Sequence, residues 1–233
     1  MADSTALLTL DDLDLLASWD TPTICNALEL LLPELPLTAY TTRPGVPLDG
    51  PFQPMIGVAR VGTIRARSRP AQPAADRFDW YDYVHAAKEL PTIVVLQDLD
   101  DQPGAGAFWG EVHSKVHLRL GARGCVTNGS FRDTDAWAPG FKMLGGCLGP
   151  SHAHVHLVGF GEPVSVLGMD VRHDDIVHAD HHGAVVIPRD CIKRLPEAVE
   201  RIAAKERRTL ELCDASDFSP DLMRRVLQQG HIH

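Results

Sequence analysis

The sequence lacks a basic surface, a disulfide framework and a long apolar run, and each absence excludes a class of protein. Lys and Arg number 22 against 31 Asp and Glu, so the formal net charge of −9 leaves no basic face to displace the counterions of a nucleic acid. The five cysteines are scattered and form no CxxC pair, which predicts reduced, mostly buried thiols in a cytoplasmic protein. The first residues are acidic rather than basic, and no stretch approaches the apolar length of a membrane span. We therefore expect neither a nucleic acid nor a membrane as a partner.

What is present indicates an ordinary globular protein. A chain of 233 residues with 44% hydrophobic and 23% charged residues can bury a sizeable core as one domain. Strand and helix patterns alternate, which predicts an α/β fold with a domain over residues 1–191. Residues 192–233 carry apolar positions at helical spacing and predict a helical extension packed on the same or a neighbouring subunit. Residues 33–54 hold six prolines and predict an irregular segment that could cover a neighbouring subunit.

Local patterns place the other elements. Thr9 or a nearby Asp is expected to cap a first helix, and Pro22 suits the first turn of a second one. A loop is expected over 68–78, and a loop or short helix over 134–140. The other expected elements are helices over 7–19, from 21, over 80–90 and from 219, and strands over 55–66, 141–144, 151–158, 164–167 and 184–187.

The stretch from residue 92 to residue 133 organises the rest. A β-branched run at 92–96 predicts a buried strand, and a glycine-rich turn follows at 103–110. A helix is expected from Glu111 to Gly121, with an apolar side that includes Val112, and a second strand at 124–127. Ligands in open α/β sheets bind beyond the carboxyl ends of the strands, so both loops fall where a small-molecule site is expected.

The glycine loop has three interpretations. A dinucleotide fingerprint does not fit, because Gly104, Gly106 and Gly110 form GxGxxxG rather than GxGxxG. A tight turn without a ligand explains the glycines equally well. Alternatively, the unpaired N–H groups at the start of the helix, together with its dipole, bind a carboxylate or a phosphate.

The pair Arg132-Asp133 at the end of the second strand favours a binding site. Arg matches a carboxylate with two parallel hydrogen bonds, and Asp supplies the oxygen ligands that Mg²⁺ and Mn²⁺ prefer. An adjacent Arg and Asp also occur as a plain solvated pair, and that alternative stays open. With Glu111 at the helix start, the residues form Glu-x20-Arg-Asp.

Two histidine-rich stretches invite a second metal. His152, His154 and His156 would share one face of a strand at period two, and imidazoles suit Zn²⁺. Histidines facing a neighbouring strand or subunit explain the same spacing without a metal. Asp180-His181-His182 offers further ligands.

The motif resembles a known family. Glu111, Arg132 and Asp133 resemble the Asp-x20-Arg-Asp motif of the metal-dependent class II pyruvate aldolases of the 4-hydroxy-4-methyl-2-oxoglutarate aldolase type. Those aldolases share a superfamily with the regulator of ribonuclease activity A. The resemblance extends to an opening helix, a first core strand and a closing strand pair, at residues 21–28, 57–64 and 174–188.

The resemblance implies a fold and an activity. The fold would be a swivelling β/β/α domain, assembled as a trimer or a dimer of trimers with sites at subunit interfaces. The activity would be retro-aldol cleavage of a 4-hydroxy-2-oxo acid to pyruvate, and oxaloacetate decarboxylation passes through the same enolate. Asp133 would hold Mg²⁺ or Mn²⁺, Arg132 would stabilise the enolate, and Glu111 would position metal-bound water and relay protons.

The N–H groups of residues 110–113 (Gly110, Glu111, Val112 and His113) would bind the substrate carboxylate. Glu111 departs from the family pattern by one methylene, and small displacements in a catalytic site are costly. It would contact the metal either directly or through water. The His113 side chain would add a contact to a different substrate, so the identity of the 2-oxo acid stays open.

Two other classes are considered. A non-catalytic binding protein, like the ribonuclease regulators of the superfamily, would act through protein contacts, but the intact Arg132-Asp133 pair argues against it. A methyltransferase label is often attached to the superfamily, but the chain has no adenosyl-methionine loop followed by a ribose-binding acid.

Overall fold

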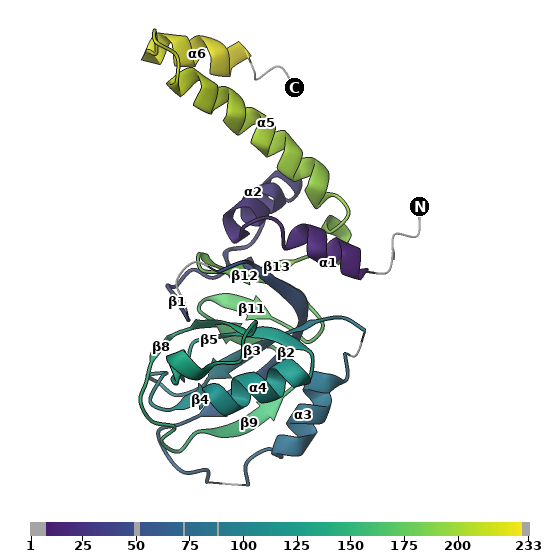
Figure 1. Cartoon of the computed structure of the whole chain (residues 1–233), viewed down its shortest axis with the longest axis vertical. Helices are drawn as coiled ribbons and strands as arrows, with labels where there is room; N and C mark the ends of the chain where they lie inside the picture. Colours follow the sequence, from purple (N-terminus) through teal and green to yellow (C-terminus); the bar gives the residue numbers. More distant parts are fainter. Residues whose placement is uncertain (1–7, 49–51, 72, 88, 230–233) are drawn as a thin grey trace.

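The computed structural model describes residues 8–48, 52–71, 73–87 and 89–229 and shows a mixed α/β domain (Figure 1). Its main sheet has eight strands in the order β1-β7-β5-β3-β2-β12-β13, and β9 also pairs with β2. Their bounds are β1 (Val46–Pro47), β2 (Met55–Arg65), β3 (Thr92–Asp98), β5 (Ala122–Thr127), β7 (Lys142–Gly145), β9 (His156–Phe160), β12 (Ile176–Asp180) and β13 (Gly183–Ile187).

The centre of this sheet is parallel. Strands β7, β5, β3 and β2 run in one direction, so their carboxyl ends share one edge. Their side chains are almost all buried, as expected for strands covered on both faces. Two small sheets complete the domain: the parallel set β4 (Ala107–Trp109), β6 (Ser130–Phe131) and β8 (Cys147–Leu148), and the hairpin β10 (Val164–Val166) with β11 (Met169–Val171).

Helices cover the sheet. Thr9 caps α1 in a reciprocal bond with Asp12, as predicted, and Pro22 stands in the first turn of α2. The α-helices are α1 (Leu10–Leu16), α2 (Thr21–Leu31), α3 (Arg77–His85), α4 (Glu111–Arg119), α5 (Leu195–Cys213) and α6 (Pro220–Gln229). Short 3-10 helices are η1 (Leu37–Ala39), η2 (Thr134–Ala136) and η3 (Arg189–Cys191).

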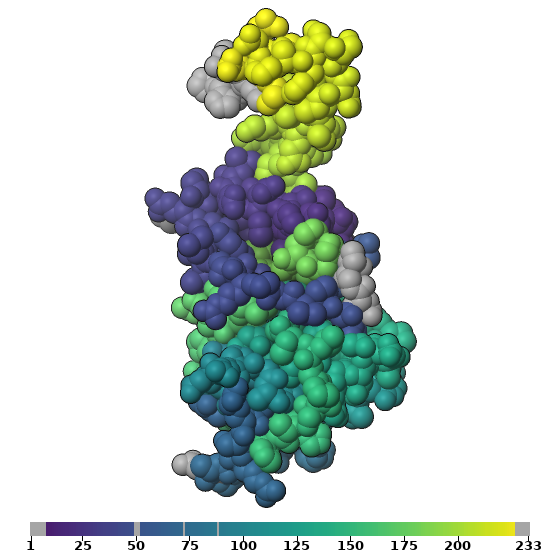
Figure 2. All heavy atoms as spheres, turned by 90° about the vertical axis from the view of Figure 1, so that its left-hand side faces the viewer, coloured from purple at the N-terminus to yellow at the C-terminus, as the bar shows by residue number. Residues whose placement is uncertain are grey.

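The C-terminal helices leave the body of the domain. Leu195, Ala198 and Val199, in the first turns of α5, are buried in the same core cluster as residues of α1 and α2. Beyond them α5 projects outward and α6 folds back at its tip (Figures 1 and 2). No helix in the described ranges is long and apolar enough to cross a membrane.

The structure corrects four local predictions. Helix α3 begins at Arg77, because the Asp76 side chain caps its first turn, and it ends at His85 rather than at residue 90. The glycine loop is not a plain turn, because it contains β4. The buried face of α4 consists of Ser114 and His117, whereas Val112 is 69% exposed. The first residues of the predicted strand at 151–158 form a turn, and only from His156 onward does β9 begin.

The cysteine prediction holds in part. All five cysteines are free. Cys125 and Cys191 are buried, Cys25 and Cys147 are partly buried, and Cys213 is exposed.

Candidate functional site

Asp98, at the end of β3, ties the glycine loop to the loop after β5. Its Oδ2 accepts the Gly104 N–H at 2.8 Å and its Oδ1 accepts the Asp100 N–H at 3.0 Å. The Asn128 side chain accepts the Asp98 N–H at 2.7 Å and donates to the Asp98 carbonyl at 2.9 Å. This acidic residue is therefore occupied in holding two loops together, and sequence reasoning had given it no such role.

Strands β4 and β6 bring the helix start to the Arg-Asp pair. They are parallel neighbours, and the Arg132 N–H donates to the Trp109 carbonyl at 3.1 Å. Gly110 follows Trp109, and a Cβ on Gly110 would lie 2.5 Å from Oδ2 of Asp133. Only a glycine permits this approach, so the backbone at the start of α4 and the Asp133 carboxylate form one cradle.

The cradle joins three residues of the predicted motif. Oδ2 of Asp133 accepts the Glu111 N–H at 3.3 Å and lies 3.5 Å from Nε of Arg132. Asp133 has φ 57° and ψ 39°, in the left-handed region that a non-glycine residue seldom adopts. The Arg132 and Asp133 side chains are 35% and 41% exposed. The pair is therefore held in a defined geometry and is still accessible to a ligand.

The cradle fits a hard divalent cation. A carboxylate offers about four lone-pair sites. In the described part of the chain, the contacts of the Asp133 carboxylate with Glu111 and Arg132 involve Oδ2 alone, which leaves Oδ1 for a ligand. A Mg²⁺ or Mn²⁺ ion is commonly held by one or two carboxylates, with waters and substrate oxygens completing its shell. Asp133 would hold such an ion.

The Glu111 carboxylate forms an ion pair that sequence reasoning missed. It accepts a hydrogen bond from Lys115, one turn further along α4, and the two side chains are 45% and 55% exposed. Glu followed by Lys four residues later is a recognisable helical pairing, so the signal was present in the sequence. An exposed pair of this kind is weak, so Glu111 can exchange Lys115 for a water or a ligand.

Two neutral histidines anchor α4. The His117 ring accepts the Trp80 indole N–H at 2.9 Å through Nε2 and bonds the His113 carbonyl through Nδ1 at 2.8 Å. Burial lowers the pKa of His117 to about 3 and that of His113 to about 4. The His113 ring packs 4.3 Å from the Phe108 ring, and its Nδ1 is buried without a partner among the described residues. His113 is thus a neutral polar group one turn into the helix that begins at the cradle.

The other predicted ligands lie elsewhere. His152 and His156 bond carbonyls within their own segment, so the expected row of histidines on one strand face is not formed. In the part of the chain that the structure describes, Asp180, His181 and His182 form the one cluster of potential metal ligands.

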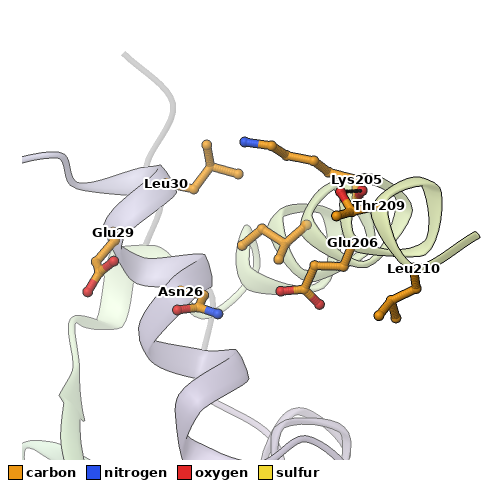
Figure 3. Close-up of a pocket in the computed structure, with 8 residues that line it drawn as sticks. Asn26, Glu29, Leu30, Lys205, Glu206, Thr209 and Leu210 are labelled. Atoms are coloured by element: carbon orange, nitrogen blue, oxygen red, sulfur yellow. Dashed lines mark hydrogen bonds between the residues drawn. The ribbon is translucent and has the colours of Figure 1, made fainter. Parts of the chain in front are cut away.

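A hollow between α2 and α5 also lies apart from the cradle (Figure 3). Glu206 extends from α5 toward α2, and Leu30 lines the opposite wall. None of the predicted site residues lines it.

A comparison with known protein families identifies the family of the chain. A sequence profile of the RraA-like family, described as Aldolase/RraA, matches residues 21–186, so the chain belongs to this family. This family includes both aldolase-type enzymes and regulators of ribonucleases. No curated protein matches the chain significantly.

Solved structures share the fold at low sequence identity. RraAS2 of Streptomyces coelicolor, described as an unusual member of the RNase ES inhibitor RraA family, is 20% identical over 88% of this chain and 100% of its own, with a TM-score of 0.68. A Pseudomonas syringae protein is 17% identical over 90% and 95%, with a TM-score of 0.65. A structure described among novel cellulases from gut-associated microbes is 17% identical over 89% and 90%, with a TM-score of 0.68.

Proposed function

We propose that this protein is a cytoplasmic, divalent-metal-dependent lyase that cleaves a 4-hydroxy-2-oxo acid to pyruvate and also decarboxylates oxaloacetate. The observation that carries the proposal is the cradle, in which Gly110 and Glu111 meet Arg132 and Asp133 although α4, β5 and β6 lie between the two pairs in the sequence. The half-exposed Arg132 and Asp133 combine a cationic fork with a metal-binding carboxylate, which are the two groups that a 2-oxo acid requires.

Each residue has a distinct role in the proposed reaction. Asp133 would hold Mg²⁺ or Mn²⁺, which would supply Lewis acidity for the 2-oxo acid. The C3–C4 bond breaks as the 4-hydroxyl loses its proton, and the electron pair passes to the departing pyruvate enolate. Arg132 stabilises the negative charge of that enolate, and Glu111, acting through water, accepts the proton and returns it to the enolate carbon.

The start of α4 would bind the substrate carboxylate. The first N–H groups of a helix have no partner within the helix, and the helix dipole favours an anion there. The Glu111 N–H already bonds Asp133, so the N–H groups of Val112 and His113 remain for the substrate. The neutral ring of His113 packs against Phe108, and it would add a contact that discriminates between substrates.

We further propose that a second subunit covers the cradle in a homotrimer or homohexamer. Val112, beside Glu111, is 69% exposed. Leu148 of β8, which pairs with Phe131 of β6, is 60% exposed. Apolar side chains beside a polar site suit an interface that excludes water from the reaction.

A panel of 2-oxo acids tests the proposal. Pyruvate release is measured with Mg²⁺, with Mn²⁺ and with EDTA, for wild type and for Asp133→Ala. We expect turnover that EDTA and the substitution both abolish. Silence across the panel would contradict the lyase and favour a regulator that binds other proteins. Turnover that persists in EDTA would contradict the role of the metal.

A further inference from the structure

The turn between β12 and β13 carries a cluster that the proposed reaction does not use. Asp180 ends β12 and pairs with Gly183, so His181 and His182 form a two-residue turn. Ala179 pairs with Met55 at the beginning of β2, whereas Asp98, which holds the glycine loop, pairs with Ile64 near the end of β2. The cluster therefore lies near the beginning of β2, at the opposite end of this strand from the glycine loop that leads to the cradle.

Asp180 is fixed before any ligand arrives. Its side chain is fully buried, and its Oδ2 accepts the Thr21 N–H at 2.8 Å. Its Oδ1 accepts the His182 N–H at 2.7 Å. The cluster therefore contains a carboxylate whose orientation is fixed by backbone hydrogen bonds.

These structural roles of Asp180 do not explain the two histidines. Nδ1 of His181 is buried and has no hydrogen-bond partner among the described residues, which is costly for a ring nitrogen. The two histidine rings lie with their centroids 3.9 Å apart and their planes tilted by 39°, and Nδ1 of His182 lies 3.2 Å from Oδ1 of Asp180. One ligand atom from each of the three residues lies within 4.8 Å of the others.

The spacing suits a tetrahedral transition-metal ion. Nitrogen and oxygen ligands about 2.0–2.1 Å from Zn²⁺ lie about 3.3 Å from one another in a tetrahedron. The contact between His182 and Asp180 already has this length. Two imidazoles and one carboxylate select Zn²⁺-class ions over Mg²⁺ or Ca²⁺. His178, on the same strand, contacts Thr21 and two backbone carbonyls and is not available as a ligand.

We infer that Asp180, His181 and His182 form a second metal site, specific for Zn²⁺-class transition metals and separate from the cradle at Asp133. Three protein ligands leave a fourth position for water, and His182, which is 46% exposed, faces the solvent side of the site. Because Asp180 also bonds the first turn of α2, a bound ion would fasten this hairpin to that helix.

The test uses the metal-free full-length protein and Co²⁺, whose visible spectrum reports tetrahedral coordination, with Zn²⁺ as competitor. We expect one ion per chain. His181→Asn and His182→Asn should each weaken metal binding by more than about 100-fold. Loss of a residue that only hydrogen-bonds to a metal ligand costs about 10–100-fold, so a larger effect indicates a direct ligand. The matched control is the double variant His152→Asn and His154→Asn on the exposed turn before β9, which should bind as wild type does.

Circular dichroism and thermal melting without metal separate loss of a ligand from loss of the fold. His182 is half-exposed, so His182→Asn should keep the melting temperature of the metal-free wild type. Its melting temperature should no longer rise when Zn²⁺ is added. Three results would overturn the inference: wild type that takes up no ion at micromolar Zn²⁺, histidine-turn variants that bind as wild type does, or a site lost in the His152 and His154 control. Asp133→Ala should leave this site intact.

Discussion

Replacing Arg132 by Lys tests whether the cradle stabilises the developing enolate or only binds substrate. The Arg132 backbone is clamped, because its N–H bonds the Trp109 carbonyl and its carbonyl accepts the Trp137 indole N–H at 2.6 Å. Nε lies 3.5 Å from Oδ2 of Asp133, which leaves the outer nitrogens of the guanidinium for the substrate. A lysine has one terminal nitrogen, so it keeps the charge but cannot contact Asp133 and the substrate as a rigid fork does.

The size of the effect follows from the loss of one oriented donor. Removing such a donor from a preorganised site reduces kcat by roughly two to three orders of magnitude, or about 2.7–4 kcal/mol in the activation free energy. KM should change much less, because the bound metal and the N–H groups at the start of α4 would still hold the substrate carboxylate. When an interaction is stronger in the transition state than in the ground state, its loss lowers kcat and leaves KM nearly unchanged.

The assay is steady-state pyruvate formation at saturating Mg²⁺. Arg119→Lys provides the matched control, since Arg119 is an exposed residue in the last turn of the same helix, and it should behave as wild type does. A normal kcat with a raised KM in Arg132→Lys would refute the reasoning. Arg132 would then only bind substrate, and stabilisation of the enolate would have to come from the metal alone.

Three further predictions concern the metal, the assembly and pH. Asp133→Ala should remove stimulation by Mg²⁺ or Mn²⁺ while the melting temperature stays within a few degrees of wild type. Asp135→Ala, at an exposed neighbouring position, is the control. Metal-dependent turnover retained in Asp133→Ala would disprove the role of Asp133 as the metal ligand. Light scattering should show a trimer or a multiple of it, and a monodisperse monomer would contradict both the oligomer and the interfacial site. The pKa of His117 is lowered from 6.5 to about 3 by burial, so below about pH 6.5 the unfolded chain binds a proton that the native chain does not. The urea midpoint should therefore fall as the pH drops from about 6.5 toward 4, and a flat profile would show that His117 does not remain neutral in the native state.

Local patterns in the sequence determined much of the fold. The β-branched run that became β3 and the Thr9 cap of α1 were predictable, because propensity and capping depend on neighbours within a few residues. The glycine run before Glu111 and the pair Arg132-Asp133 were equally visible, and their positions after strands pointed to a shared edge of the sheet.

The tertiary structure decided which of these residues meet. The 3.3 Å contact from the Glu111 N–H to Asp133 depends on the parallel pairing of β4 with β6, and β4 is too short to show a periodic pattern. The face of α4 was misjudged for a related reason, since His117 is buried by its bond with Trp80, a residue on another helix. The histidines at 152–156 had the period of a strand, but His152 and His154 lie in the turn before β9. His181 and His182, in contrast, were brought to Asp180 by a tight hairpin. Periodicity reports which side of a local element a residue occupies, but a site depends on contacts between elements distant in sequence, and only the folded chain defines those.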